Sequence, residues 1–337
     1  MLVQRPSLSW RRMENKEADG WVEVPLTKVQ EKRSTMRKLK RVIQIKDRSI
    51  RFKKYNKCFT GSDAVAHLRE ILKLSESDAT EHATELMQAG FFCNIKTRGG
   101  PFENSSTAFY AFTKVPTNEE LLGEISDAWA KKIMNIVQNN DPLNPTWELE
   151  RDGEVKVCTC SLNNIPIRAI RVETVTTASA ESLMQVLHTQ LFEYHKEWNS
   201  DFISGEIVQT VNENVTLQHW KFTVKTSTVS DRDFLIVRRV WQDSMGKHYI
   251  LDKSVKSGLM QRQKDFIRCT VLFQLRMIEQ LDNGKVRLVH CNLTDLRGSI
   301  PAIVVNSANV RISQEQVKSI VAVAERECAL LEACLDG

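Results

Sequence analysis

The sequence predicts an α+β protein of two domains, and three observations support this. Its 337 residues exceed one typical domain, and 42% of them are hydrophobic, enough for sizeable cores. Up to about residue 115, helical patterns alternate with short strand-like segments. Beyond that point one helix precedes many strand-like segments, and a long helical pattern from about Pro301 ends the chain. This second order fits a curved antiparallel sheet wrapped around a terminal helix.

The first predicted element is strongly basic. Residues 28–57 hold 13 Lys or Arg against two acids, a net charge of +11, so the rest of the chain sums to −6 within a total of +5. Apolar residues recur in this block first at helical and then at strand spacing, which indicates a folded element with a buried face. They are Leu26, just before the block, then Val29, Met36, Leu39, Val42 and Ile43, followed by Ile50, Phe52 and Tyr55.

Such a concentration of charge suits an anionic partner. Because only Phe52 and Tyr55 could stack on bases, we expect an anionic membrane surface and no nucleic acid. The alternative is that the block is only a solvated face. The residues expected to bind membrane are Lys38, Arg41, Arg48, Arg51, Lys53, Lys54 and Lys57.

Other features bear on the class of protein. No segment reaches the roughly 18 to 20 consecutive apolar residues of a spanning helix, and Arg5, Arg11 and Arg12 lie where a secretory signal would be apolar. We therefore expect a cytoplasmic protein, reversibly peripheral on membranes. The eight cysteines are scattered without metal-ligand spacing, which predicts reduced thiols, no metal and no cofactor. Without a GxSxG, an HExxH or a phosphate-binding loop, we expect no catalytic residue and no enzyme activity.

Residues 1–19 are expected to be a disordered segment, and residues 20–115 to form the first domain. After the basic block come two helices, ending near Leu72 and Gly90, and then a closing hairpin. The segment resembles the DEP family in Phe59-Thr60-Gly61-Ser62-Asp63-Ala64-Val65, Gly90-Phe91 and Phe109-Tyr110-Ala111-Phe112. The resemblance implies a winged-helix-like bundle with a β-hairpin that docks on anionic lipid or on a receptor tail.

Residues 117–337 are expected to form the second domain. Thr117 to Glu120 is a capping box that opens one amphipathic helix reaching Ile136. A single helical stretch, residues 180–198, interrupts the strands that follow. The domain resembles the START lipid-transfer family in Trp147-Glu148-Leu149, Glu197-Trp198-Asn199, Ser230 to Arg238, Asp252-Lys253-Ser254-Val255, Phe266-Ile267-Arg268 and Asp295 to Pro301. The resemblance implies a helix-grip fold that encloses one lipid, a phospholipid or a sterol, in a tunnel between the sheet and the last helix.

The strand alternation predicts which residues face this tunnel. Phe234, Ile236, Arg238 and Val240 share one face of their strand, and Cys269, Val271, Phe273, Leu275 and Met277 share a face of another. Because an arginine among apolar positions is costly unless it is paired, Arg238 is either a ligand anchor or a salt-bridge member. The residues expected to line the tunnel are Arg238, Phe234, Ile236, Val271, Phe273, His290 and Ile303, and those expected at its mouth are Met245, Ile300 and Pro301.

Together the two domains suggest an intracellular protein that binds or transfers lipid and is recruited to anionic membranes by its first domain. The alternative is a lipid-sensing adaptor whose first domain binds a receptor or G-protein regulator, a signalling protein. An acyl-transfer activity of Cys269 or Cys291 beside His290 is the weakest of the readings.

Overall fold

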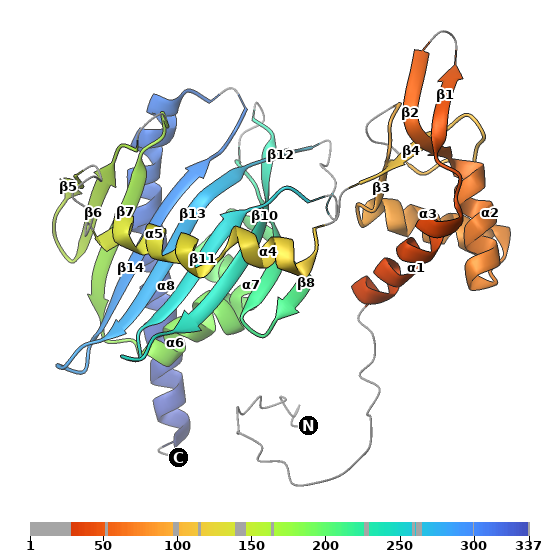
Figure 1. Ribbon diagram of the computed structural model, residues 1–337. Helices are drawn as coiled ribbons and strands as arrows, with labels where there is room; N and C mark the ends of the chain where they lie inside the picture. Colours follow the sequence, from red (N-terminus) through yellow and green to blue (C-terminus); the bar gives the residue numbers. More distant parts are fainter. Residues whose placement is uncertain are drawn as a thin grey trace.

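The computed structural model describes residues 28–50, 53–96, 101–113, 116–138, 146–162, 165–225, 229–257, 260, 265–298 and 300–335. The predicted segment 1–19 and Arg51 lie outside these residues. Two bodies follow one another along the chain, a small helical one with a protruding hairpin and a larger one built on a broad sheet (Figure 1). The α+β class predicted from the sequence is confirmed.

The first domain packs three helices against a small antiparallel sheet of strand order β1-β2-β4-β3. Its core is aromatic: the ring of Phe59 contacts those of Phe92, Tyr110 and Phe112 at centroid distances of 4.7–6.0 Å. Its elements are α1 (Lys28–Val42), β1 (Lys46–Ile50), β2 (Lys53–Thr60), α2 (Gly61–Leu72), α3 (Glu76–Gln88), β3 (Phe92–Asn94) and β4 (Phe109–Phe112).

Helix α2 begins directly at the end of β2, and the junction is tight. Thr60 caps the helix, and its hydroxyl accepts a hydrogen bond from the amide of Asp63, whose carboxylate accepts one from the amide of Thr60. The amide of Gly61 donates to the carbonyl of Ala108 at 3.1 Å. A Cβ atom on Gly61 would lie 1.9 Å from the carbonyl oxygen of Glu103, so only glycine lets the two backbone segments approach this closely.

The second domain is a ten-stranded antiparallel sheet with helices on both faces, apart from one short parallel pairing of β12 with β10. The strand order is β5-β6-β7-β14-β13-β11-β10-β9-β8. The strands are β5 (Glu148–Arg151), β6 (Val155–Cys160), β7 (Ala169–Thr176), β8 (Phe202–Asn212), β9 (Val215–Phe222), β10 (Asp231–Gln242), β11 (His248–Ser254), β12 (Phe266–Arg268), β13 (Thr270–Gln280) and β14 (Val286–Asp295).

One face of this sheet carries the two helices α4 (Asn118–Glu124) and α5 (Asp127–Gln138), which cross it in Figure 1. The capping box of Thr117 and Glu120 is present, as predicted. The single helix expected to reach Ile136 is wrong, because the chain leaves helical geometry at Ile125 before α5 begins.

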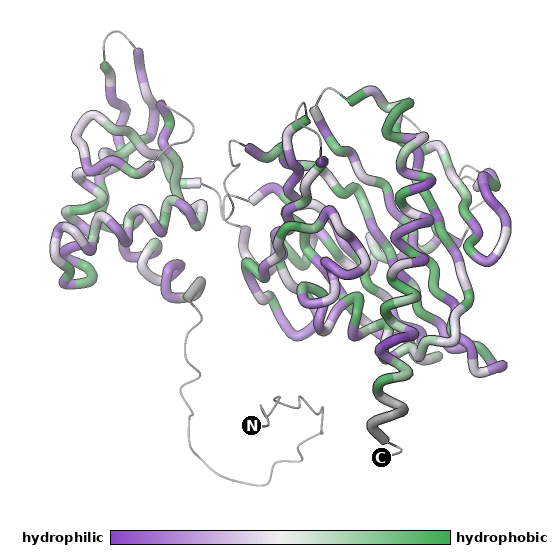
Figure 2. The backbone as a smooth tube through the Cα atoms, turned by 180° about the vertical axis from the view of Figure 1, so that it is seen from behind, coloured by the Kyte–Doolittle hydropathy of each residue, from purple (hydrophilic) through white to green (hydrophobic). Residues whose placement is uncertain are grey.

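The other face carries the remaining helices, with the long α8 (Ala302–Leu335) running along the sheet as Figure 2 shows from behind. The stretch predicted as one helix is three elements: α6 (Ala180–Met184), the π-helical turn η1 (Gln185–Thr189) and α7 (Leu191–Trp198). The π turn is closed by the amide of Gln190 donating to the carbonyl of Gln185 at 2.9 Å. Such turns are rare and often mark functional regions.

No helix of the described residues is both long enough and apolar enough to span a bilayer.

The tight junction at Gly61 leads to a stability prediction. Gly61→Ala should destabilise the first domain by about 1–3 kcal/mol, because the added methyl group forces the Glu103 backbone away. Urea denaturation of the full-length protein, with hydrogen exchange resolved for each domain, measures the loss. The matched control is Gly123→Ala in α4, whose Cβ would meet nothing within 4 Å and which should gain up to about 1 kcal/mol of helix propensity. Equal effects of the two substitutions would contradict the steric argument.

Candidate lipid-binding cavity

A cavity of about 330 Å³ lies between the sheet and the helices α7 and α8. One face of β9, β10, β13 and β14 and residues of α7 and α8 line it. Aromatic and aliphatic side chains form part of its walls, and polar side chains form the rest. The principal lining residues are His195, Trp198, Trp220, Phe222, Arg232, Phe234, Val271, Gln274, Arg276, Asn292, Leu296, Asn309, Ile312, Ser313 and Gln316.

The structure brings together some of the predicted tunnel residues and separates others. Phe234 and Val271 line the cavity. Ile236, Arg238 and His290 are buried but do not line the cavity. The prediction that Phe234, Ile236, Arg238 and Val240 share one face of their strand is correct. The three apolar residues belong to one core cluster, and Arg238 donates to the helical layer on the same side of the sheet. The prediction for Ile303 is wrong, since its side chain is 75% exposed on α8.

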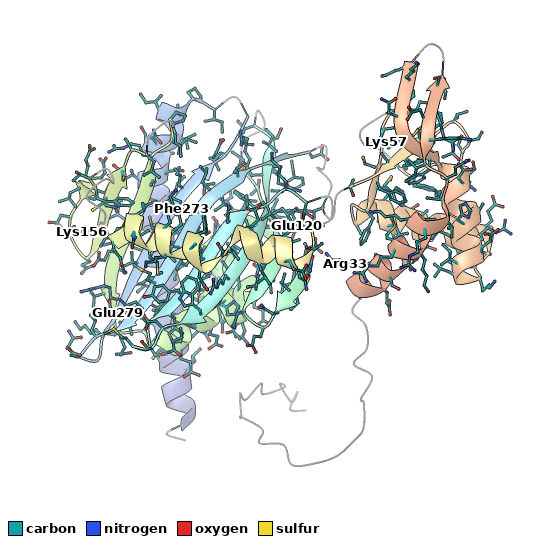
Figure 3. The ribbon with its side chains drawn as sticks, in the orientation of Figure 1. Arg33, Lys57, Glu120, Lys156, Phe273 and Glu279 are labelled. Atoms are coloured by element: carbon teal, nitrogen blue, oxygen red, sulfur yellow. The ribbon has the colours of Figure 1, made fainter. Side chains whose placement is uncertain are left out.

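Phe273 was also placed on the wrong face, and the cause is a β-bulge. In the pairing of β13 with β14, Val271 faces Thr294 and Phe273 faces Leu293, so Leu272 is an extra residue on β13. The bulge shifts the alternation by one residue. Phe273 therefore joins the core on the side of the sheet that carries α5, where Figure 3 labels it, and so do Leu275 and Met277.

The same bulge turns two polar residues into the cavity. Gln274 and Arg276 line it, and neither is among the residues predicted to face the tunnel. A signal was available in the sequence, because a strand that is apolar at Phe273, Leu275 and Met277 has polar residues only at the intervening positions. In a strand buried on both faces, such polar positions need partners or a ligand.

Arg238 is the centre of a buried ion pair beside the cavity. Its side chain is 0% exposed, and its Nε and one terminal nitrogen each donate to an oxygen of Asp252 at 2.7 Å. The other terminal nitrogen donates to the carbonyl of Leu187 at 2.9 Å, within the π turn. Asp252 lies directly across from Arg238 on β11. Of the two predicted roles for Arg238, the structure thus shows the salt bridge.

Arg276 is a second buried guanidinium and shares the same carboxylate. One of its terminal nitrogens donates to Oδ2 of Asp252 at 3.4 Å. When the side-chain amide of Gln274 is oriented so that its nitrogen donates to Asp252, its oxygen accepts a hydrogen bond from Arg276 at 3.0 Å. Burial, together with the neighbouring Arg238, lowers the pKa of Arg276 to about 10, so the group is still charged at neutral pH.

Two nearby histidines are kept neutral by burial and, to a lesser degree, by the arginines. Burial is the main cause that holds the pKa of His195 well below its ordinary value, and Arg276 and Arg238 add to it. Burial and Arg276 act in the same way on His290. Both imidazoles are therefore neutral at physiological pH. Within the part of the chain that the structure describes, the Nδ1 atom of each has no partner.

The predicted mouth residues lie at two different ends of the sheet. Ile300 lines a second cavity, of about 450 Å³, under the start of α8, and Leu296 lines both cavities. Pro301 is exposed beside it. The prediction that Met245 lies at the mouth is wrong. Met245 is 90% exposed in the turn after β10. Arg232, which lines the first cavity, lies at the other end of this 12-residue strand, roughly 40 Å away. Ser299 lies outside the described residues.

The basic residues of the first domain form two groups. Lys53, Lys54 and Lys57 are exposed on the hairpin, and Lys38 and Arg41 are exposed on α1. Arg48 is already committed within the domain, since it donates to Asp63 at 2.7 Å and lies over the ring of Phe109. Figure 3 shows Lys57 on the hairpin and Arg33 on α1. Among the described residues, no group of three or more His, Cys, Asp or Glu is placed to hold a metal ion.

Comparison with known proteins agrees with this geometry. The model of the START domain matches residues 128–329, and that of the domain found in Dishevelled, Egl-10 and Pleckstrin (DEP) matches residues 42–112. A search of curated proteins gives no match.

Two solved human structures illustrate the likeness of the fold. STARD10 shares 18% identity with a TM-score of 0.55, over 63% of this chain and 84% of its own. StAR-related lipid transfer protein 5 shares 20% identity with a TM-score of 0.56, over 62% of this chain and 98% of its own. The chain belongs to the START family and carries a DEP domain ahead of its START domain.

Proposed function

We propose that this protein binds one lipid in the START cavity, carries it between membranes, and is recruited to anionic membrane surfaces by its DEP domain. The observation that carries the proposal is the cavity between the sheet and α8, with Trp198, Trp220, Phe222 and Phe234 in its walls. Apolar walls with a few convergent polar groups are the usual form of a small-ligand site.

The exposed lysines of the hairpin support the recruitment step. Each lysine near an anionic leaflet contributes about 1 kcal/mol, so Lys53, Lys54 and Lys57 together would contribute roughly 3 kcal/mol. That strength gives reversible adsorption, which suits a carrier that must also leave the membrane.

The role of Arg238 in this function is structural. Each of its three nitrogens donates a hydrogen bond, two of them to Asp252 and one to the Leu187 carbonyl. We infer that it holds the helical layer against the sheet and that it does not anchor the lipid.

Transfer of labelled lipid between donor and acceptor liposomes tests the carrier proposal. A carrier moves many lipids per protein molecule, whereas a lipid-sensing adaptor binds about one and stops. Val271→Trp, which fills the cavity, should abolish transfer. Val175→Trp is the matched control, because Val175 is exposed on β7. Transfer by the Val271 variant at the rate of the unaltered protein would reject the cavity as the lipid site.

Charge reversal tests the membrane surface separately. Lys53→Glu, Lys54→Glu and Lys57→Glu together should weaken adsorption to phosphatidylserine vesicles by at least about 3 kcal/mol at low salt, measured by co-sedimentation. The control reverses Lys131, Lys132 and Lys156, which are exposed on the START domain and give the same change in net charge. If both triple variants bind equally, the hairpin is not the membrane-binding surface.

The scaffold role of Arg238 predicts a loss of stability that does not depend on ligand. Arg238→Leu should lower the free energy of unfolding by about 3 kcal/mol, the lower end for a broken buried pair, because Arg276 still faces Asp252. Thermal melts with and without lipid should show the same decrease. A decrease seen only in the presence of lipid would assign Arg238 to ligand binding instead.

A further inference from the structure

We propose that the lipid is a single-chain amphiphile with an anionic head group, a carboxylate or a phosphate, and that the buried Arg276 binds this head group inside the cavity. The proposal rests on the proposed function, since it names the ligand of the same cavity.

The buried charges at the cavity are not balanced. Two guanidinium groups, those of Arg238 and Arg276, share one carboxylate. Arg238 occupies both oxygens of Asp252 at 2.7 Å, which leaves Arg276 a single contact with Asp252 at 3.4 Å. The acid among the described lining residues is Asp201, which is half-exposed and paired with Lys225 at 2.6 Å. A third buried guanidinium, that of Arg232, also lines the cavity and bonds to the carbonyls of Leu296 and Ser230. Positive charge is therefore in excess among the described residues here, and Arg276 is the guanidinium that lacks a full set of acceptors.

Two buried polar atoms at the cavity are unsatisfied. Arg276 is 2% exposed and lines the cavity, and its Nε atom has no partner among the described residues. The same holds for the Nδ1 atom of His195, which also lines the cavity. Leaving a charged donor buried without an acceptor is costly. An anionic group would neutralise the charge and accept the bond, and a guanidinium matches carboxylate and phosphate oxygens especially well.

The aromatic walls favour a hydrocarbon chain over a cationic head group. A cage for an ammonium group needs several free ring faces around one point. The guanidinium of Arg238 lies over one face of Trp220 at 5.1 Å from the ring centroid, and His195 stacks on one face of Trp198 at 4.0 Å. Each of these two rings therefore offers a ligand one face at most, and a buried guanidinium nearby would repel a cation.

The cavity is small for a lipid site. A volume of about 330 Å³ lies at the lower end of the roughly 300–1,000 Å³ found for small-ligand pockets. One acyl chain suits this space better than the two chains of a membrane phospholipid.

The test compares head groups on one chain, with the full-length protein. Binding of oleate, 1-oleoyl lysophosphatidic acid, 1-oleoyl lysophosphatidylcholine and oleyl alcohol is measured by titration calorimetry below their micelle concentrations, and stoichiometry by native mass spectrometry. At least one of the two anionic lipids should bind one to one and roughly tenfold or more tighter than the alcohol and the zwitterion, because hydrogen bonds to charged groups are the strong ones. Whichever anion binds tighter identifies the head group as carboxylate or phosphate.

Arg276→Met should abolish this preference while keeping the binding of oleyl alcohol. Arg276→Lys, which keeps the charge, should retain part of the preference. Arg287→Met is the control, because Arg287 lies in the same sheet, is paired with Glu173 and Glu279, and does not line the cavity. The melting temperature of the ligand-free Arg276→Met protein should not fall, since the change removes an incompletely paired buried charge. A large fall would indicate a structural role for Arg276 and overturn the proposal.

Two further results would overturn the proposal. Equal affinity for oleate and oleyl alcohol would remove the head-group preference, and equal affinity for dioleoyl phosphatidic acid would remove the single-chain limit. In both cases lipid would still bind, so the proposed function would stand. If neither these probes nor any lipid retained from cells binds one to one, the proposed function fails together with this inference.

Discussion

The contact on which the rest of the START domain depends is the guanidinium of Arg238. It joins three parts of the chain: β10, which carries it, β11, which supplies Asp252, and the π turn, which supplies the carbonyl of Leu187. A buried ion pair adds little net stability compared with apolar residues of the same volume. The ion pair instead fixes the position of the helical layer on the sheet. The helical layer meets the sheet at one register, and the cavity keeps its shape beside that contact.

The π turn explains how a helix can supply such an acceptor. In a regular α-helix the carbonyl of Leu187 would accept a bond from the amide four residues on. In η1 the local bonds run to the fifth residue, as between Gln185 and Gln190. The Leu187 carbonyl can therefore serve a side chain of the sheet. The widened turn and the buried arginine thus make one structural unit.

Much of the fold could be predicted from the sequence, because the signals were local. The alternation at Phe234, Ile236 and Arg238 and the capping box at Thr117 each depend on a few neighbouring residues. The break at Ile125 and the π turn could not be read this way, since the helical spacing of apolar residues continues through both. Met245 and Ile303 were misplaced for another reason. Both were placed at the tunnel because they are apolar, but both are exposed. The sequence does not show whether an apolar residue in a turn or on a helix is buried, or which end of the sheet it lies near.

The floor of the cavity was missed because it depends on Leu272. If the strand kept all its residues but had no bulge, regular alternation would turn Phe273, Leu275 and Met277 toward α8 and move Gln274 and Arg276 to the opposite face. The cavity would then have an apolar floor made from the same strand. The chemistry that this site offers to a lipid is therefore set by the presence of one bulge as much as by the identity of the residues, and a strand of the same sequence with regular pairing would offer a lipid a different surface.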